Sequence, residues 1–436
     1  MLRRTALMLA VSTALAAPAA AQITVNSDPI LFWNDLMVSR VGGGPPVQTR
    51  TYAMANIAMH DAVNAALGKP NFGYLSVKGA GGGDTRAAAS AAARNVLVAL
   101  DPANAAHYNA AYDASLALVA DGAAKTQGIQ NGSLHAAAII ARRAGDGSAN
   151  GFVYTPGTNP GDWRPTPPAG APGAFPHWGS VEPFLMTAGD QFRPGAPPAL
   201  GSAEYAAAYN EVKDIGALNS ASRTADQTAS ALFWDASNGG TWLRVGLLVA
   251  EDEAMDTIGF ARTFALLTTG LADAMIGGFD AKYHYALWRP ITAIRLGDLD
   301  GNDLTQVDPG WQSLFNSPAH PSYLSTHSAL SGAGSSVLMG LLGDTQGFGF
   351  SIGPDTRSFT GLAQAAQDGA DSRLWGGIHF RFDNEAGLAT GRGIGQWALA
   401  GRAFNAVPEP GSWAMLIAGF GLVGALQRRQ LVRAAS

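Results

Sequence analysis

The segment KYHYALWRP, residues 282–290, carries two cations in an otherwise aromatic and apolar context. Lys282 and Arg289 are seven positions apart, which is two turns of an α-helix, so a helix here would place both side chains on one face. The residues around them would bury that face, and a buried cation requires an anion. Pro290 is expected to end or kink the helix. The segment therefore predicts a buried cationic site near the end of a helix.

A second polar stretch, HPSYLSTHS at residues 320–328, comes just before a helix-like run. Ser325 belongs to the residue types that cap helix N-termini. The first turn of such a helix offers unpaired N–H groups and the positive end of the dipole, which favour an oxyanion. His327 is expected at the rim of that turn. Taken alone, the stretch is equally compatible with a loop that only begins a core helix.

The third stretch, SRLWGGIHFRFDNEAG at residues 372–387, contains Arg373, His379 and Asp383. On a helix, His379 and Asp383 would share a face, so the carboxylate could hold one ring nitrogen and leave the other lone pair pointing outward. The glycine pair at 376–377 allows a tight turn just before the histidine. This pattern predicts that His379 is a nucleophile or a ligand of a metal oxyanion.

The three stretches together supply three cations, a helix N-terminus and two histidines. A tetrahedral oxyanion needs neutralised charge, a covalent partner and a proton carrier, so the combination predicts an oxyanion site. A serine hydrolase built on Ser322 or Ser325 with His327 would need a Gly-x-Ser-x-Gly elbow, and the sequence has none. A zinc site at the histidines would need a histidine pair at helical spacing or His-Glu-x-x-His, which are also missing.

The spacing of these motifs resembles the three-part signature of the vanadium-dependent haloperoxidase and type 2 phosphatidic acid phosphatase superfamily. The first and third motifs, within 282–290 and 372–383, match position for position. The second motif, within 320–328, departs from the family pattern Pro-Ser-Gly-His, because Leu324 replaces the proline and Thr326 replaces the glycine. The segments AMANIAMHDAVNA, RTADQTASALFWD and KYHYALWRPITAIR further resemble the secreted, all-helical haloperoxidase-like branch.

The resemblance implies a role for each matching residue. His379 would bind vanadium axially or attack phosphorus, Asp383 would orient it, and His327 would be the acid or base. The remaining motif positions would hold the oxygens of vanadate, or of phosphate in a phosphatase: Lys282, Arg289, Ser325, Thr326 through its amide, and Arg373.

The resemblance leaves the chemistry open, because vanadate and phosphate share one ligand set. The chain length and helical N-terminal half favour a vanadium haloperoxidase that uses hydrogen peroxide, a halide and a small organic acceptor. His320 aligns with a residue on the halide side of the pocket, so bromide or iodide is favoured over chloride; a plain loop histidine is the alternative. A secreted acid phosphatase working through a phosphohistidine and a non-catalytic surface protein are the other readings. A homo-oligomer is compatible with each.

Three further places in the sequence carry residues that could act in a site, but their context favours other roles. His60 and Asp61 could be a ligand pair, but their helical context favours a structural role. Asp235, in FWDASNGG, could pair with an active-site arginine or histidine, although capping of a turn is preferred. His284 lies off the face of Lys282 and is left out of the site.

The body of the chain predicts an all-α fold, a large helical-bundle domain over residues 22–405. Apolar residues recur three and four apart in several Ala-rich segments, as in helices. The run 242–288 is expected to form two long helices with a break near Gly270 or Gly277. The Pro- and Gly-rich piece 154–178 is expected to pack over the helices or to cover an entrance.

Both ends of the chain are predicted to be targeting signals. Residues 1–21 have two arginines, an apolar run and an Ala-x-Ala ending, as in a secretory signal peptide. Residues 406–436 contain Pro-Glu-Pro, a short apolar run and a basic end, and resemble the PEP-CTERM sorting signal of Gram-negative bacteria. Export and sorting machinery are therefore expected partners. The resemblance implies a secreted or cell-surface protein that passes through the periplasm, with its tail transiently in the inner membrane.

Composition agrees with export. The formal net charge is −5, and the basic residues at the two ends leave an acidic body, which argues against nucleic acid as a partner. The sequence contains no cysteine, so disulfides and thiolate metal sites are excluded.

Overall fold

The computed structural model describes residues 23–78, 81–251, 253–344 and 347–406. The secretory signal expected at 1–21 and the sorting tail from residue 407 onward lie outside these ranges. The described part is mostly helical, so the all-α prediction is confirmed. None of its helices combines the length and the apolar character that a crossing of the bilayer requires.

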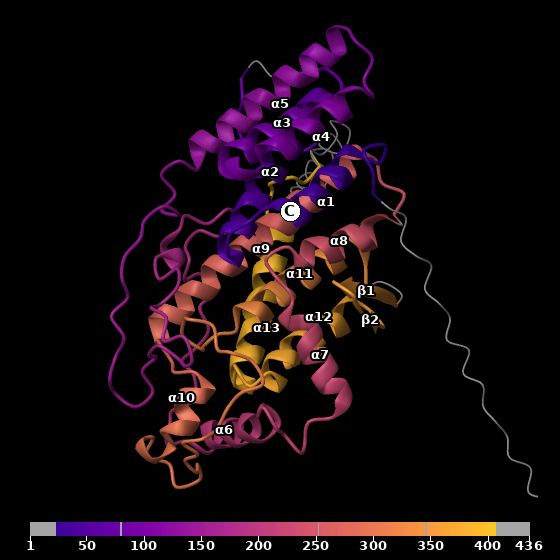
Figure 1. Ribbon diagram of the computed structural model, residues 1–436. Coiled ribbons are helices and arrows are strands. Elements are labelled where there is room, and N and C mark those ends of the chain that lie inside the picture. The colour runs from indigo at the N-terminus through magenta and orange to yellow at the C-terminus, as the bar shows by residue number, and fades with distance from the viewer. Residues whose placement is uncertain (1–22, 79–80, 252, 345–346, 407–436) are drawn as a thin grey trace, which may run out of the picture.

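The first half of the chain forms a helical layer at one end of the molecule (Figure 1). Here α2, α3 and α5 pack against one another, and α1 and α4 border them. Their alanine-rich faces allow close helix contacts, and most of the alanines of α3 are fully buried. The helices of this half are α1 (Pro29–Arg40), α2 (Pro45–Ala66), α3 (Thr85–Leu100), α4 (Ala105–Leu116) and α5 (Ala123–Arg142), with a 3₁₀ turn η1 (Pro102–Asn104).

The second half is organised around the long helix α9, which packs against α2 on one side and against α11 and α13 on the other. Figure 1 shows α11, α12 and α13 together in the centre of this half, with α6 and α10 at the far end from α5. The helices are α6 (Ala203–Ile215), α7 (Ala225–Asp235), α8 (Thr241–Glu251), α9 (Thr257–Tyr285), α10 (Pro290–Arg295), α11 (Thr326–Leu342), α12 (Leu362–Trp375) and α13 (Arg381–Ala400), with 3₁₀ turns η2 (Trp178–Ser180) and η3 (Gly297–Leu299).

The predicted helix break near Gly270 or Gly277 is wrong, because α9 continues through both glycines. The break falls earlier, between α8 and α9. There Asp256 caps α9, since its carboxylate accepts the N–H of Gly259 at 2.9 Å. The missing side chains inside α9 instead allow close packing, as at Gly278, where an added Cβ would meet the methyl group of Thr326 at 2.6 Å.

A two-stranded antiparallel hairpin, β1 (Phe348–Ile352) and β2 (Asp355–Phe359), was not predicted. Its two-residue turn begins at Gly353, whose φ of +60° suits glycine. Phe350 and Phe359 are buried against the aromatic end of α7. This packing, which a single short strand pattern does not reveal, keeps the hairpin in place.

The irregular piece 154–178 covers the helices, as predicted. The N–H of Trp163 donates to Ala286 at 2.6 Å, and Trp288 donates back to Gly161 at 2.8 Å. Farther along, Ala174 donates to Ala319 at 2.7 Å, just before the second motif. The piece is therefore fixed to the segments that carry the predicted oxyanion site.

Candidate active site

Lys282 and Arg289 do not lie on one helix, so the prediction that they share a helix face is wrong. Helix α9 ends at Tyr285 because Ala286 adopts a left-handed conformation (φ 49°), and Arg289 occupies the N-cap position of α10. Both side chains are nevertheless fully buried. The ammonium of Lys282 donates to the carbonyl oxygens of Pro321 at 2.8 Å and Ser322 at 3.0 Å. The Lys282 side chain thus holds the first motif against the backbone carbonyls of the second.

Arg289 joins all three motifs. Its Nε donates to the carbonyl of His320 at 2.9 Å, and its Nη2 contacts Nδ1 of the same residue at 2.9 Å. Its Nη1 donates to the carbonyl of Ile378 at 2.7 Å and lies 3.0 Å from Nε2 of His379. The guanidinium therefore stands beside the ring atom that the sequence predicts to be reactive.

His379 and Asp383 do form a pair, but not on one helix face. His379 precedes α13, and Asp383 lies in its first turn. The chain reaches this geometry through Gly377, whose φ of +75° permits the sharp turn after α12. One oxygen of Asp383 accepts from Nδ1 of His379 at 2.9 Å, from the N–H of Phe380 at 3.0 Å and from the Ser322 hydroxyl at 2.5 Å.

The Asp383 contact fixes the histidine tautomer. Because a carboxylate can only accept, Nδ1 of His379 carries the proton and Nε2 carries the lone pair. Nε2 accepts from Nη1 of Arg289 at 3.0 Å, and His379 lines the cavity. The predicted orienting role of Asp383 thus has the geometry it requires.

Ser325 is the N-cap of α11, as predicted: its hydroxyl accepts the N–H of Ser328 at 3.3 Å. Within the described residues, the N–H groups of Thr326 and His327 have no hydrogen-bond partner. The ring of His327 lies edge-on to Trp234, with centroids 5.9 Å apart, and its Nδ1 is 3.3 Å from the Ser237 hydroxyl. The helix start therefore offers two free amides next to a histidine.

A cavity of about 370 Å³ is lined by residues of the second and third motifs. Lys282, Arg289 and Ser325 are not among the residues that line it, although Arg289 contacts His320 and His379, which are. Five of the predicted site residues line it directly: His320, Thr326, His327, Arg373 and His379.

The rest of the cavity wall comes from segments that sequence reasoning did not connect with the site. Pro45 and Pro46 at the start of α2, Phe175 from the irregular piece and Phe279 from α9 form an apolar side. No local signal marks these residues as part of a site. They reach the cavity only because the two halves of the chain pack together.

Asp235 was expected to cap a turn, and this preference is wrong. Asp235 is the last residue of α7, lines the cavity, and accepts from Nη2 of Arg373 at 3.4 Å. Ser237, two residues later, reaches His327. The FWDASNGG segment thus contributes two side chains to the site, Asp235 and Ser237. In the sequence, the only sign of this role is that a carboxylate and a hydroxyl residue lie two positions apart.

The other two secondary predictions agree with the structure. His60 and Asp61 are buried in α2 and contact each other at 2.8 Å, away from the cavity, so their role there is structural. His284 is exposed on α9 and does not line the cavity.

The three histidines beside the cavity titrate below their usual range. Burial is the largest cause of the lowered pKa of His320, His327 and His379, and nearby cations are the next cause. At neutral pH the imidazoles are therefore uncharged, and the arginines carry the positive charge of the site.

The buried charges of the site are unbalanced. Burial lowers the pKa of Lys282 well below its usual value, and Arg289 lowers it further. Burial raises the pKa of Asp383 to about 6, although the Ser322 hydrogen bond and Lys282 act against this. Nη1 of Arg373 is buried without a partner in the described part of the chain. A tetrahedral oxyanion in the cavity would supply the missing negative charge and the missing acceptors, so the residues fit vanadate or phosphate.

Comparisons with known proteins agree with this geometry. Residues 262–404 match the model of the VCPO second helical-bundle domain, and residues 406–430 match the PEP-CTERM protein-sorting motif. The vanadium chloroperoxidase of Curvularia inaequalis is 25% identical over 398 residues, which covers 71% of this chain and 64% of that protein. The chain thus spans slightly less than two thirds of the length of this relative.

Solved structures show the same arrangement of helices. A bacterial vanadium-dependent iodoperoxidase superposes with a TM-score of 0.74 at 26% identity, over 87% of this chain and 98% of that one. The holo form of a bacterial vanadium-dependent chloroperoxidase superposes with a TM-score of 0.66 over 82% and 92% of the two chains, and its 17% identity supports the fold alone. By sequence and fold, this chain is therefore similar to the vanadium haloperoxidases, and its residues 406–430 match the PEP-CTERM sorting motif.

Proposed function

We propose that this protein is a vanadium-dependent haloperoxidase that oxidises a halide with hydrogen peroxide. The observation that carries the proposal is that residues of the second and third motifs line one cavity, while Arg289 of the first motif contacts two of them, His320 and His379. The similarity to vanadium haloperoxidases supports the choice of vanadate over other oxyanions.

The proposed vanadate site uses residues of all three motifs. Nε2 of His379 would bind the metal, with its lone pair presented by the Asp383 contact. Lys282, Arg289 and Arg373 would neutralise the oxygens, and the free amides of the α11 N-terminus would donate to them. Bound vanadate would supply a Lewis-acidic centre that activates hydrogen peroxide toward halide.

His327 would move the proton. It lies on the cavity wall at the start of α11, and its lowered pKa keeps the imidazole neutral, so it can accept a proton from hydrogen peroxide. The 3.3 Å contact between its Nδ1 and Ser237 would hold the ring. Thr326, in place of the family glycine, still provides its backbone N–H.

We further propose that bromide or iodide is favoured over chloride. His320 lines the cavity against Phe279, with ring centroids 5.4 Å apart. The family resemblance would put this imidazole on the halide side of the pocket. The similar iodoperoxidase structure supports this preference. The small organic acceptor would meet the apolar wall formed by the prolines of α2 and Phe175.

The test is one assay panel on the purified protein. Halogenation of monochlorodimedone with peroxide, orthovanadate and each halide is measured beside hydrolysis of p-nitrophenyl phosphate without vanadate. We expect bromination and iodination that require vanadate and are lost in His379→Ala. The exposed His284→Ala is the matched control and should keep full activity.

Two results would contradict the proposal. Phosphatase turnover that vanadate inhibits, without halogenation, would identify the secreted acid phosphatase with a phosphohistidine. Inactivity in both assays, together with no vanadate binding, would identify a non-catalytic surface protein.

The PEP-CTERM motif indicates export and sorting to the cell surface of a Gram-negative bacterium. We propose that the route passes through the periplasm and that the tail is held transiently in the inner membrane. The partners would be the export machinery at the N-terminal signal and the sorting machinery at the tail. A homo-oligomer of the mature protein remains a prediction, which light scattering would test.

A further inference from the structure

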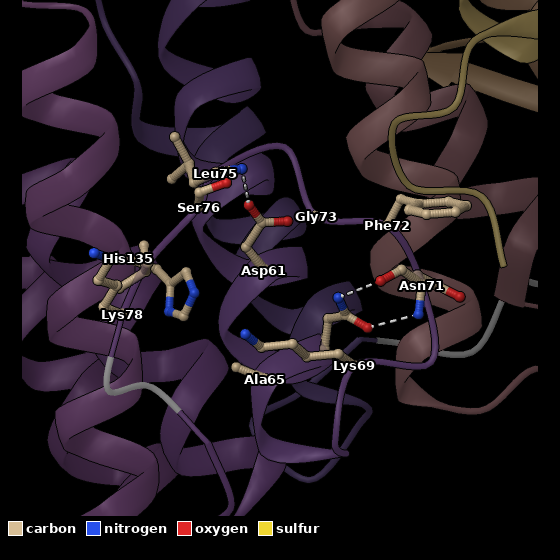
Figure 2. Close-up of a pocket in the computed structure, with 12 residues that line it drawn as sticks. Asp61, Ala65, Lys69, Asn71, Phe72, Gly73, Leu75, Ser76, Lys78 and His135 are labelled. Atoms are coloured by element: carbon tan, nitrogen blue, oxygen red, sulfur yellow. Dashed lines mark hydrogen bonds between the residues drawn. The ribbon is translucent and has the colours of Figure 1, made fainter. Parts of the chain in front are cut away.

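A second pocket, of about 650 Å³, lies in the N-terminal half, between the end of α2, the loop that follows it and α5 (Figure 2). It shares no lining residue with the candidate active site. Its wall includes the apolar side chains of Phe72, Leu75 and Val77 and the polar side chains of Lys69 and His135. The proposed reaction does not use this pocket, although Asp61 in its wall belongs to the segment AMANIAMHDAVNA.

The described chain ends at the edge of this pocket. The N–H of Phe72 donates to Asn405 at 2.8 Å, and the N–H of Phe404 donates to Phe72 at 2.9 Å. Asn71, which lines the pocket, forms an antiparallel bridge with Ala406. The root of the sorting tail is therefore paired with the loop that forms the pocket wall.

This root is held firmly by side chains as well. Phe404 is fully buried, edge-on to His60 at 4.8 Å and stacked on Tyr74 at 6.0 Å between ring centroids. The side-chain oxygen of Asn405 accepts from Arg262 on α9 at 2.7 Å. The position and direction of the chain at Ala406 are thus set by the folded body.

The direction of the bridge determines where the next residues can go. Because Ala406 pairs antiparallel with Asn71, a continuation of this pairing would lead the chain back along Pro70 and Lys69. Glu409 is three positions after Ala406, and an extended chain covers about 3.3 Å per position, or about 10 Å in all. Glu409, the centre of the Pro-Glu-Pro triplet, can therefore reach the pocket.

The polar groups of the pocket suit a peptide that carries a carboxylate. Figure 2 shows the amino group of Lys69 directed into the pocket, between Asn71 and His135. His135 is buried and donates from Nδ1 to the carbonyl of Asn131 at 2.8 Å, so its Nε2 is an acceptor without a partner among the described residues. A carboxylate would satisfy the first group, and a peptide N–H would satisfy the second.

The one carboxylate in the wall, Asp61, does not compete for Lys69. Its oxygens accept from the N–H groups of Tyr74 at 3.1 Å and Leu75 at 2.6 Å and from the His60 ring at 2.8 Å. With these donors in place, Asp61 holds the loop, and the positive charge of Lys69 faces the pocket without a partner of opposite sign among the residues that line it. Lys78 on the same loop adds a second positive charge.

We propose that this pocket binds the Pro-Glu-Pro segment of the chain's own tail, residues 407–410, with the Glu409 carboxylate paired to Lys69. The prolines would pack on Phe72 and the neighbouring apolar side chains, and they lack the N–H groups that burial would leave unsatisfied. The sorting signal would then be presented from a fixed position on the folded body. Sorting machinery that reads the triplet would first have to lift it out of the pocket.

A cysteine pair tests the contact, since the natural chain has no cysteine that could interfere. Lys69→Cys with Glu409→Cys is introduced into the full chain, purified uncleaved in detergent and oxidised. The matched control pairs Glu409→Cys with Lys213→Cys on α6, at the other end of the molecule (Figure 1). Tryptic peptides linking positions 69 and 409 should exceed the control pair at least tenfold by mass spectrometry.

Equal yields in the two pairs would overturn the proposal. Disulfide-linked dimers as the main product would overturn it as well, because the pocket would then hold the tail of a second copy.

A charge exchange provides an independent test that does not depend on disulfide formation. Lys69→Glu should increase the rate of proteolytic cutting within the tail severalfold, and Lys69→Glu combined with Glu409→Lys should restore the slow rate. Lys213→Glu should leave the rate unchanged. Equal cutting in all four chains would show that the tail does not occupy the pocket.

Discussion

Two buried clusters of cations differ in how they are neutralised. In the N-terminal half, Arg143 is fully buried and contacts Asp146 at 3.0 Å, and Arg50 contacts the same carboxylate at 2.7 Å. Arg143 also donates to the carbonyls of Glu182 at 2.5 Å and Pro183 at 3.1 Å. In the candidate active site, Lys282 and Arg289 bind carbonyl and imidazole groups instead, and the Asp235 contact of Arg373 is 3.4 Å long.

The difference separates a structural role from a binding role. The Arg143 cluster joins α2, α5 and the segment before α6, and its carboxylate lies at its centre. Each cluster leaves one buried guanidinium nitrogen without a hydrogen-bond partner in the described residues, Nε of Arg143 and Nη1 of Arg373. The clusters differ in charge and position: Arg373 lines a cavity, and the described residues give Lys282 and Arg289 no carboxylate within ion-pair distance. A buried cation without a counter-ion is costly, so it persists where a ligand supplies the charge.

The largest expected effect concerns the Arg143 cluster, called the closed cluster because Asp146 neutralises its cations. Asp146→Ala should lower the free energy of unfolding by about 3–5 kcal/mol, because it leaves two guanidinium groups buried without their carboxylate. Asp235→Ala lies in the active-site cluster of Lys282, Arg289 and Arg373, which is called the open cluster below. It should lower the free energy of unfolding by less than about 1 kcal/mol, since the Asp235 side chain is 46% exposed. Denaturant unfolding of both variants measures the contrast. Equal losses would show that the two clusters do not differ in kind.

Lys282→Met tests whether the open cluster serves ligand binding and not stability. We expect vanadate affinity to fall about a hundredfold, or about 2.7 kcal/mol, because a buried cation beside the oxygens is lost. The stability of the vanadate-free protein should stay unchanged or rise, because no carboxylate contacts the ammonium directly. Binding is measured by titration and stability by thermal unfolding.

Arg143→Met is the matched control for Lys282→Met. It should destabilise the fold and leave the vanadate affinity of the folded fraction unchanged. A loss of stability in Lys282→Met as large as that in Arg143→Met would indicate a structural lysine.

The next largest expected effect is a lower free energy of unfolding at acidic pH, caused by the three histidines beside the open cluster. The folded-state pKa values of His320, His327 and His379 lie below the unfolded value of about 6.5, so the unfolded chain binds more protons as the pH falls. The stability that these neutral histidines provide is therefore present above pH 6.5 and is lost below it. The raised pKa of Asp383, about 6, works in the opposite direction below pH 6. Between pH 7 and pH 6 we expect a loss of about 2 kcal/mol.

Urea unfolding at pH 7.0, 6.5 and 6.0, with and without orthophosphate, measures this loss. Phosphate should reduce it, because a bound anion favours the imidazolium forms. If phosphate has no effect at any of these pH values, the histidines do not face an anion site.

The sequence predicts the identity of the site residues better than their local structure. Arg289 and His379 of two predicted motifs come into contact although neither Lys282 with Arg289 nor His379 with Asp383 lies within one helix, because loops between the helices bring them together. The left-handed residue Ala286, which ends α9 four residues before Pro290, has no sequence signal. The helical fold follows from the 3.6-residue pattern, which long segments display strongly.

The misses share a physical cause, which is tertiary packing. The hairpin 348–359 is stabilised by aromatic contacts with α7, and the glycines inside α9 serve close packing where a break was expected. The apolar wall of the cavity comes from residues as far apart in sequence as Pro45 and Phe279. Such contacts depend on the assembled structure and leave no local pattern.

The smallest effect concerns Thr326, which replaces the family glycine in the second motif. An alanine Cβ at Gly278 would lie 2.6 Å from the Thr326 methyl group, so α9 has room for the threonine only because residue 278 lacks a side chain. Gly278→Ala should therefore destabilise the natural protein by about 1 kcal/mol. In a Thr326→Gly background the same change should stabilise it, since alanine is favoured over glycine inside a helix.

Gly270→Ala is the control for this cycle, because its Cβ would meet its nearest neighbour, Val337, at an ordinary 3.4 Å. It should have the same effect in both backgrounds. Unfolding and vanadate affinity are measured for each single and double variant. A change of sign at 278 alone would mean that α9 and the helix start at 326 have adjusted to each other, so that the free amides of α11 stay in place despite the larger residue. Additive effects at 278 and 326 would mean that the threonine is accommodated elsewhere, and the departure from the family motif would then have to weaken the open cluster directly.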